Sequence, residues 1–382
     1  MRKFAVLTIA LWFLAGSLLS HETNVTTVLF DREIVRILDE HCVMCHVERG
    51  LSFPLTTYEE TWLRGRTIRT AILRRHMPPW AAVAGYGQFI NGNSLTLRET
   101  QFLVSWVEGL GPRNAGTVFL NVLDPGAKPR EEVHAVSQFG HWQLGEPGLT
   151  RSLPAQTIGA EQTDHVRRVV LDSGLKAESR VRAVEYIPGD RRVVRAAFFS
   201  IQETGQWIGS WTPWFGYSLL PANTAFRLAA GSHIVAEIHY RGAKEPVVDQ
   251  GRMGLFFANS TTSTAANSVS DLVLEARGEV PASTSVKRFR AQTRLTANIT
   301  TLALRPETLP GAQSIEVSAR RPDGGTEILL FAKDMPEAWP TPYIFKEPVR
   351  LTRGTDLAVT VTYANTSASP RPGGVRLTVS RY

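Results

Sequence analysis

The sequence contains only two cysteines among its 382 residues, and they stand close together at positions 42 and 45. A network of structural disulfides is therefore excluded, and the folded domains must be held by their hydrophobic cores. After the first twenty residues, no apolar run is long enough to cross a bilayer. No nucleic-acid-binding motif accompanies the net charge of +7 and the pI near 9.6, so we do not interpret this charge as DNA or RNA binding.

Residues 1–20 have the pattern of a secretory signal peptide. Arg2 and Lys3 precede an apolar run from Phe4 to Leu19, with small residues near its end. The run is slightly short for a membrane span. No clean A-x-A cleavage site follows it, so an uncleaved anchor stays open as an alternative. We expect an exported, periplasmic protein, attached to a membrane only if this segment is retained.

The most informative motif is Cys42-Val43-Met44-Cys45-His46, which has the C-x-x-C-H spacing of a c-type haem attachment site. Each thiol can form a thioether with one porphyrin vinyl group, and the adjacent imidazole of His46 can bind the iron as the proximal ligand. Attachment of c-type haem outside the bacterial inner membrane agrees with export. A buried disulfide, a redox C-x-x-C pair or a chance occurrence are the alternatives. We expect one haem c, bound covalently by Cys42 and Cys45.

The residues around this motif predict a small all-α cytochrome c domain over residues 27–113. Apolar residues at helical spacing in 30–38 lead directly into the motif. Thr57 and Glu60 form a capping box for a second helix, which should run through Arg75 and end before two prolines. Thr96 and Glu99 predict a third helix, ended by glycines at 109 and 111. Its buried face should consist of Phe102, Leu103, Trp106, Val107 and Leu110.

The iron of such a haem needs a sixth ligand, and we expect it to be Met77. This residue precedes Pro78 and Pro79, which fix the loop, and thioether ligation is usual in electron-transfer haems. Met44 lies inside the attachment loop and cannot reach the distal side. His76 is the rival ligand, and an open site is the third alternative.

Several arginines surround this loop, namely Arg64, Arg66, Arg69, Arg74 and Arg75. They are either a solvated helix face or a positive rim that steers an acidic redox partner protein. If the second interpretation holds, the partner docks near Arg64, Arg69, Arg74 and Arg75.

The remainder of the chain has the pattern of β-sandwiches. Short runs of alternating apolar and polar residues are separated by turn signals such as Pro188-Gly189-Asp190 and Asp323-Gly324-Gly325. We expect two jelly-roll-like sandwiches of ordinary domain size, at 135–262 and 268–382. A linker at 114–134 should separate them from the helical domain. The fold class is thus multidomain, with an all-α domain followed by two all-β domains.

Taken together, these segments resemble a bacterial c-type cytochrome fused to a copper type II, ascorbate-dependent monooxygenase-like region, whose relatives are the peptidylglycine and dopamine hydroxylases. In the cytochrome part the resemblance rests on Cys42–His46, Gly50–Leu55, Thr57–Glu59, Met77–Trp80, Leu95–Thr96 and Trp106–Val107. Beyond it, the similar segments are His141–Pro147, Arg182–Asp190, Ala230–Tyr240, Pro322–Gly324, Trp339, Tyr343 and Asn365. The resemblance is strong in the cytochrome part and moderate in the β region.

The copper ligands that this resemblance implies are largely missing. The expected His-His pair after Val193-Val194 is replaced by Arg195-Ala196, and no histidine follows His239. Arg241 stands where a partner of His239 is expected, and no methionine follows Asn365. A fixed positive charge repels a metal ion. We therefore regard copper as an improbable cofactor.

His239 is the one possible residual copper-site histidine, and we interpret it instead as structural. His233 lies on the same face of the expected strand but roughly 20 Å away, too far to share an ion. Met253 and Met335 are better explained as core residues than as ligands.

Two functional hypotheses follow. In the first, the chain is an exported monohaem electron-transfer cytochrome whose degenerate monooxygenase-like region serves as a docking or structural module, and it has no catalytic residues. In the second, it is a copper-dependent monooxygenase supplied with electrons by its own haem domain. Haem chemistry at an open iron site, or ligand binding by the sandwiches, is less favoured.

Overall fold

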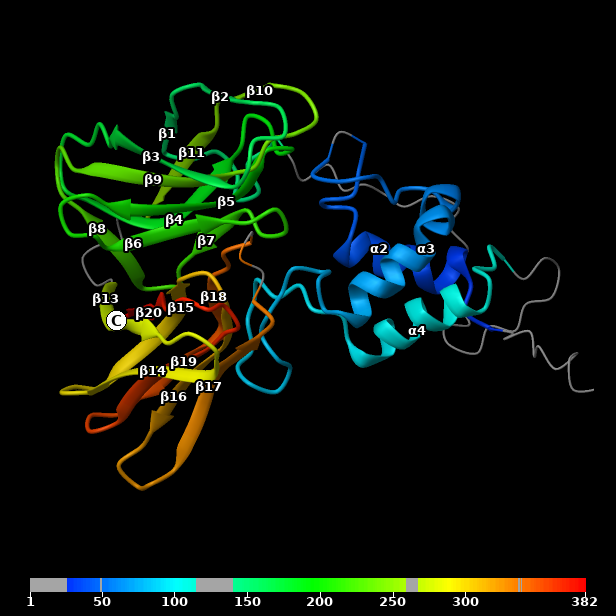
Figure 1. The fold of residues 1–382 in the computed structure, drawn as a ribbon. Helices are drawn as coiled ribbons and strands as arrows, with labels where there is room; N and C mark the ends of the chain where they lie inside the picture. Colours follow the sequence, from blue (N-terminus) through cyan, green and yellow to red (C-terminus); the bar gives the residue numbers. More distant parts are fainter. Residues whose placement is uncertain (1–25, 49, 115–139, 259–266, 336, 338) are drawn as a thin grey trace, which may run out of the picture.

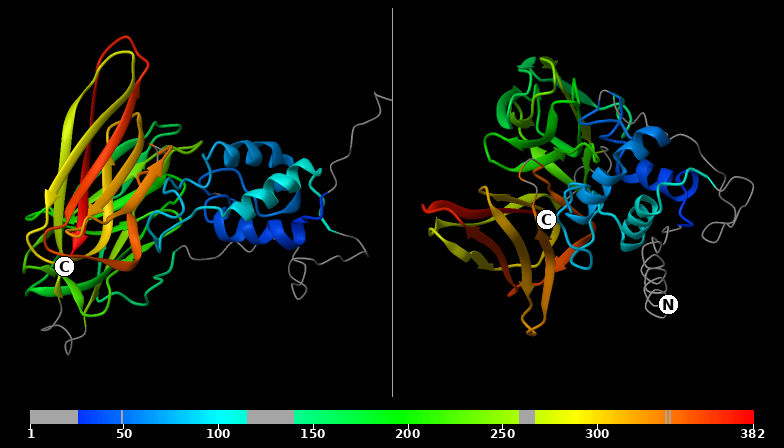
Figure 2. Two further views of the ribbon diagram at one scale, coloured as in Figure 1. Left: turned by 90° about the horizontal axis from the view of Figure 1, so that it is seen from below. Right: turned by 45° about the vertical axis from the view of Figure 1, so that its right-hand side comes forward.

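The computed structural model describes residues 26–48, 50–114, 140–258, 267–335, 337 and 339–382. The expected signal peptide, nearly all of the expected linker and the junction of the two β domains lie outside these residues. The described chain is mostly β and forms a helical unit beside two stacked β-sandwiches (Figure 1). Two further views show the helical unit on one side of the paired sandwiches (Figure 2). No helix within the described residues is long and apolar enough to span a membrane.

The helical unit consists of four short elements around one core. These are a π-helical turn η1 (Phe30–Ile34) and the α-helices α2 (Val35–His41), α3 (Tyr58–Leu73) and α4 (Leu97–Glu108). Both expected capping boxes are present: Thr57 with Glu60 begins α3, and Thr96 with Glu99 begins α4. In the core, Phe30, Leu38, Leu103 and Trp106 are fully buried, which joins the first and last helices.

The prediction is wrong for one residue of the expected buried face of α4. Leu110 is 73% exposed, whereas Leu103 and Trp106 are buried as expected. The helix ends at Glu108, and the backbone then turns, with Leu110 at a φ of +67°. Because helical periodicity does not continue past this turn, Leu110 cannot lie on the face of the helix.

The first sandwich packs a sheet with the order β1-β11-β4-β8-β12 against a sheet with the order β3-β9-β5-β6. Strand β7 pairs with β4, and β2 pairs with β10. In β9 the side chains of Ile234, Ala236, Ile238 and Tyr240 alternate into the core, the period-2 pattern expected of a strand with one buried face. The strands are β1 (Leu149–Ser152), β2 (Gln156–Ile158), β3 (His165–Asp172), β4 (Ser179–Ile187), β5 (Val194–Ile201), β6 (Trp207–Trp211), β7 (Tyr217–Leu219), β8 (Thr224–Leu228), β9 (His233–Tyr240), β10 (Val247–Asp249), β11 (Arg252–Phe257) and β12 (Asn267–Ser268).

The second sandwich packs two four-stranded antiparallel sheets, with the orders β13-β20-β15-β18 and β14-β19-β16-β17. Apart from the hairpin of β16 and β17, neighbouring strands in each sheet are distant in sequence, as in a double-sheet jelly roll. The prediction of two β-sandwiches is confirmed. The strands are β13 (Ser270–Val280), β14 (Thr284–Arg294), β15 (Ile299–Thr308), β16 (Ala312–Arg320), β17 (Thr326–Lys333), β18 (Tyr343–Leu351), β19 (Asp356–Asn365) and β20 (Arg371–Arg381).

The segment between α3 and α4 connects the helical unit firmly to the second sandwich. We call residues 80–91 the anchoring loop; Trp80 and Ala82 belong to the same buried cluster as the core of that sandwich. The backbone of the loop continues its sheet edges, with N–H groups of Val83 and Ile90 donating to Phe331 and Ile344 at 2.8 Å each. The side chain of Asn91 donates to the carbonyl of Pro342 at 2.7 Å and accepts from the N–H of Ile344.

Replacing Trp80 with alanine should lower the free energy of unfolding by about 3 kcal/mol, because large-to-small changes of buried aromatic residues leave a cavity. Trp80 is 8% exposed, and its ring lies 5.2 Å from that of Tyr343. The measurement is denaturant unfolding followed by circular dichroism. The matched control is Trp62→Ala, since Trp62 is 52% exposed and should change stability much less. Equal losses in the two variants would contradict the anchoring role.

Candidate functional site

Residues of the C-x-x-C-H motif line one cavity of about 240 Å³, which we call the cysteine cavity. On the motif side it is lined by Cys42, Cys45 and His46. Met77, which is distant from the motif in the sequence, also lines the cavity. The remaining residues of the helical unit are mostly apolar and come from α3 and from the loops that flank it: Leu51, Phe53, Leu55, Ile68, Ile72 and Leu95.

The motif follows directly on the end of α2 at His41, and its backbone folds into a tight loop. The N–H groups of Cys45 and His46 both donate to the carbonyl of Cys42 at 3.0 Å. The chain then returns over the motif, with Leu55 N–H donating to the carbonyl of His46 at 2.9 Å. These bonds fix the two thiols and the imidazole on the same short loop.

The imidazole of His46 is held by one of its two nitrogens. Its Nδ1 lies 2.9 Å from the carbonyl oxygen of Phe53, and its ring lies 4.9 Å from the ring of that residue. Nε2 has no hydrogen-bond partner among the described residues. Burial lowers the pKa of His46, so the ring is neutral. A neutral imidazole whose Nδ1–H is bonded to a carbonyl is the arrangement that leaves Nε2 available to a metal ion.

The two cysteines are free thiols in this structure. Burial raises the pKa of Cys42 to about 12 and that of Cys45 to about 11, although the charges of Arg191 and Arg195 act against the second shift. Redox C-x-x-C pairs depend on a thiolate of lowered pKa. The surroundings of these thiols therefore disfavour a thiol–disulfide exchange site.

The structure separates the two candidates for a sixth ligand. Met77 is partly buried and lines the cysteine cavity, whereas the adjacent His76 is exposed and does not. The N–H of His76 donates to the carbonyl of Ala71 at 2.8 Å, which places it in the turn that ends α3. A thioether and an imidazole are thus both available around one cavity.

The expected arginine rim is only partly free of acidic partners. Arg69 forms an ion pair with Glu108, and Arg75 lies 3.9 Å from Asp334 of the second sandwich. Arg64 is exposed and lies over the ring of Phe53 at 4.9 Å, beside the motif histidine. Arg74 is also exposed. Arg64 is thus connected to the motif histidine through Phe53.

Sequence reasoning did not assign any β-domain residue to this site, yet three of them line the cysteine cavity. Arg195 of β5, Arg241 directly after β9 and Trp339 before β18 close it from the two sandwiches. The guanidinium of Arg191 also donates to the backbone carbonyl of Met44 in the motif loop. The sequence showed Arg195 and Arg241 only as replacements of expected histidines, which gave no sign that they face the motif.

His239 lies in an ion-pair network that joins the sandwiches. Its Nε2 is 3.1 Å from Glu237, whose carboxylate also binds Arg168 at 2.7 Å and Arg305 of β15 at 3.0 Å. This carboxylate provides a structural partner for His239; whether His239 also binds a metal ion stays a prediction. His233 pairs with Glu203 at the surface instead. Met253 is fully buried and Met335 packs against the core of the second sandwich.

This network predicts an acid-sensitive junction between the sandwiches. Burial alone would raise the pKa of Glu237, but hydrogen bonding to His239 and the charges of Arg305 and Arg168 lower it from 4.5 to about 2. A depressed pKa stabilises the fold above the unfolded value and loses that contribution as the pH falls. Unfolding free energies should therefore drop by about 3 kcal/mol between about pH 4.5 and about pH 2 through this group.

The check is urea unfolding across this range for the natural chain and for Glu237→Gln. The variant should be less stable at neutral pH and should lose the part of the acid dependence that Glu237 contributes. Glu178→Gln is a matched control, because Glu178 forms an exposed pair with Arg227. If Glu237→Gln kept the same dependence of the unfolding free energy on pH as the natural chain, Glu237 would not be the group responsible.

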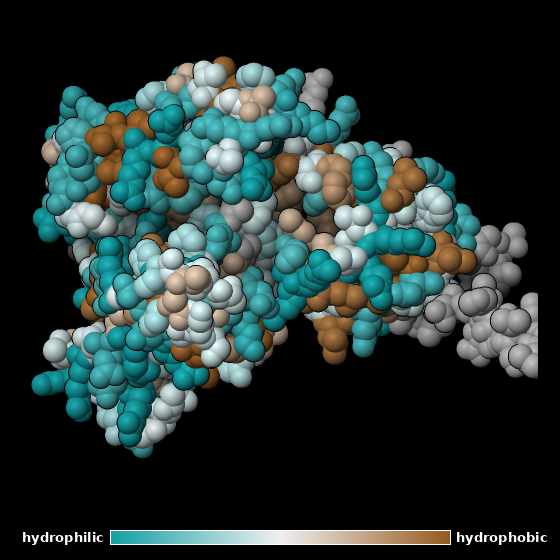
Figure 3. Space-filling view, in the orientation of Figure 1, coloured by the Kyte–Doolittle hydropathy of each residue, from teal (hydrophilic) through white to brown (hydrophobic). Residues whose placement is uncertain are grey.

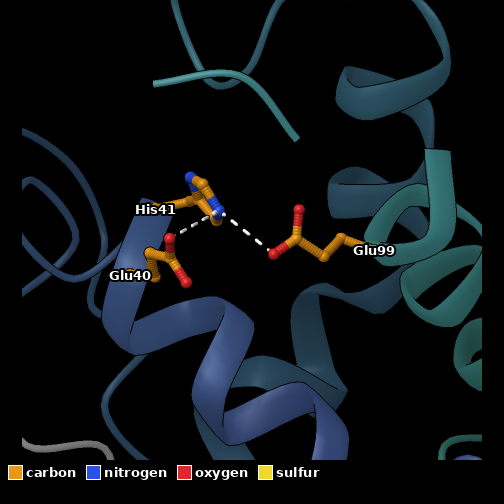
Figure 4. Close-up of side chains that lie close together, drawn as sticks. All are labelled: Glu40, His41 and Glu99. Atoms are coloured by element: carbon orange, nitrogen blue, oxygen red, sulfur yellow. Dashed lines mark hydrogen bonds and ion pairs between the residues drawn. The ribbon is translucent and has the colours of Figure 1, made fainter. Parts of the chain in front are cut away.

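A second group of side chains near the cavity, Glu40, His41 and Glu99, has the composition of a metal site (Figure 4). The nitrogens of His41 already have partners, Nδ1 with Asn93 at 3.0 Å and Nε2 with Glu99 at 3.4 Å. Glu99 also accepts from the capping residue Thr96. These contacts connect α2 to α4 and are explained by structure alone.

Comparisons with known proteins leave the family of this chain open. No family model matches it, and no curated protein matches it. Matches among solved structures include a quasi-atomic model of the PBCV-1 virus capsid, with 9% identity over 61% of this chain and 92% of that chain and a TM-score of 0.21. The crystal structure of PBCV-1 VP54 fitted into a reconstruction of the virophage Sputnik gives the same identity and coverage with a TM-score of 0.18. Similarity at this level does not support an inference about the fold or function of this chain.

Proposed function

We propose that this chain is an exported monohaem c-type cytochrome that transfers electrons, with its two sandwiches acting as a structural and docking module. One observation carries the proposal: the two thiols, the imidazole of His46 and the thioether of Met77 line a single cavity. When bound there, haem c would supply an iron that alternates between the ferrous and ferric states.

The residues present fit this group. Cys42 and Cys45 have the spacing for two thioether bonds, and neither is used in a disulfide. The contact with Phe53 orients the ring of His46 and leaves its Nε2 available. Met77 would complete the coordination, and the apolar lining would exclude water. Ligation by the same residues in both oxidation states would keep reorganisation small, which suits electron transfer.

The β region supports a structural role better than a copper site. At the position of the expected histidine pair, Arg195 offers a cation in place of a ligand. The remaining His239 shares its Nε2 with a carboxylate that two arginines also bind. The anchoring loop and the hydrogen bond from Arg191 to the carbonyl of Met44 hold the sandwiches against the helical unit. The helical unit and the two sandwiches would then form one rigid body.

The surface of the helical unit is suited to a protein partner. In the orientation of Figure 3 apolar residues gather at the surface of the helical unit and in further groups on the first sandwich, on an otherwise mostly hydrophilic surface. On α3, Leu63 is 74% exposed, and the exposed Arg64 lies over Phe53, beside the motif histidine. A positive charge at this place would suit an acidic redox protein that docks near the motif.

The test is the absorption spectrum of the chain produced in a host that matures c-type haem. A ferrous spectrum that does not change on addition of carbon monoxide would support six-coordinate electron transfer. A spectrum that changes would mean that the sixth position is open, and chemistry at the iron would replace our proposal.

A further inference from the structure

Arg195 is a buried cation that faces the cysteine cavity without a hydrogen-bond partner for two of its nitrogens. The residue is 7% exposed, and its Nε and Nη1 are buried and unsatisfied among the described residues. It is the extra residue of a β-bulge: Val194 pairs with Tyr240 and Ala196 with His239, which leaves Arg195 unpaired between them. Bulges redirect side chains, and here the bulge turns Arg195 toward the motif.

The position of the guanidinium is further defined by Trp339. The guanidinium carbon lies 4.8 Å from the centre of that ring, so a residue of the second sandwich supports a side chain of the first. A contact with the face of an aromatic ring uses no N–H donor of arginine in a hydrogen bond, so the donors remain available to an anion. Within the described residues, no hydrogen bond to an acidic side chain satisfies those donors.

Arg241 stands beside it and makes the local charge more positive. It lines the same cavity. Burial and, second to it, the charge of Arg241 lower the pKa of Arg195 to about 10, so Arg195 stays protonated at neutral pH. Asp164, whose charge acts on Arg195, is bound by Arg241 at 3.0 Å. Two neighbouring cations, one of them buried, are costly unless an anion joins them. Arginine binds carboxylates in particular, through paired N–H donors.

We infer that Arg195, with Arg241 beside it, binds the propionate carboxylates of the haem, so that the first sandwich forms part of the haem site. The inference rests on the proposed function. Haem c carries two such carboxylates in addition to the vinyl carbons that the cysteines would take. The sandwich is then a positioning element for the cofactor, and Arg195 is a positioning residue that tunes its potential.

The test compares midpoint potentials of the matured full-length chain and its Arg195→Gln variant. Loss of the guanidinium leaves a carboxylate charge uncompensated near the iron, which favours the ferric state. We expect the reduction equilibrium to shift about tenfold toward the ferric form, a drop of about 59 mV for one electron. Arg195→Lys, which keeps the charge, should recover more than half of this shift. Arg227→Gln is the control, since Arg227 of the same sandwich is exposed and paired with Glu178.

The outcomes separate the inference from the proposed function. A chain without covalent haem would remove the proposed function itself. Covalent haem with an unchanged potential in Arg195→Gln would overturn the inference alone, as would a lysine variant that recovers nothing. If the Arg195→Gln protein does not accumulate, Arg241→Gln replaces it in the test, because Arg241 is half-exposed. We expect a smaller drop in the midpoint potential for that variant. Citrate at constant ionic strength should leave the natural potential unchanged; a citrate-dependent shift that Arg195→Gln abolishes would assign the site to a soluble carboxylate instead.

Discussion

Replacing both Cys42 and Cys45 with serine should abolish covalent haem on this chain. Serine is close to cysteine in size, but its hydroxyl cannot form the thioether that both positions are proposed to make. The expected result is complete loss of haem absorbance from the denatured polypeptide, whereas the natural chain retains it. Each single variant should retain at most one bond and accumulate less haem protein.

The control for this experiment lies in the fold itself. Each sandwich has its own buried core, so the double variant should keep the β-sheet signal in circular dichroism. Loss of haem with an intact sheet signal would separate attachment from folding. Haem that stays on the denatured double variant would contradict the role of these cysteines.

Replacing Met77 with alanine should open the sixth coordination position of the iron. The side chain of Met77 lines the cysteine cavity, and removing the thioether leaves no donor of that kind beside it. Methionine ligation raises the reduction potential of a haem. We expect the variant to bind carbon monoxide in the ferrous state and to fall in potential by more than about 59 mV, a tenfold change in the equilibrium.

The adjacent His76 offers a matched control, because it is exposed and does not line the cavity. His76→Ala should retain the natural spectrum and potential. The reverse pattern, with a carbon monoxide complex in His76→Ala alone, would assign the distal ligand to His76. If both variants kept the natural spectrum, neither residue would be the ligand.

Local sequence patterns predicted most of the secondary structure. The capping boxes at Thr57 and Thr96 begin α3 and α4, and alternation in residues 234–240 marks β9. Such signals depend on neighbours in sequence, so they can be read without the fold. Leu110 was misplaced because its apolar character continues the helical pattern beyond the point where the backbone leaves the helix.

Contacts between distant segments could not be predicted in this way. The anchoring loop follows two prolines and has the composition of a turn, yet its partners are residues such as Pro342. Arg195 looked like a lost ligand, and only the bulge in β5 shows that its side chain faces the motif. Both features depend on long-range packing, which periodicity and spacing do not encode.

The most direct test of the central claim is the content of iron and copper per chain, measured together on haem-matured protein that has then been offered copper. A monohaem cytochrome with a silenced monooxygenase-like scaffold predicts one iron and no firmly held copper. One iron with one or two retained coppers would contradict this account and would favour a copper-dependent monooxygenase supplied with electrons by its own haem.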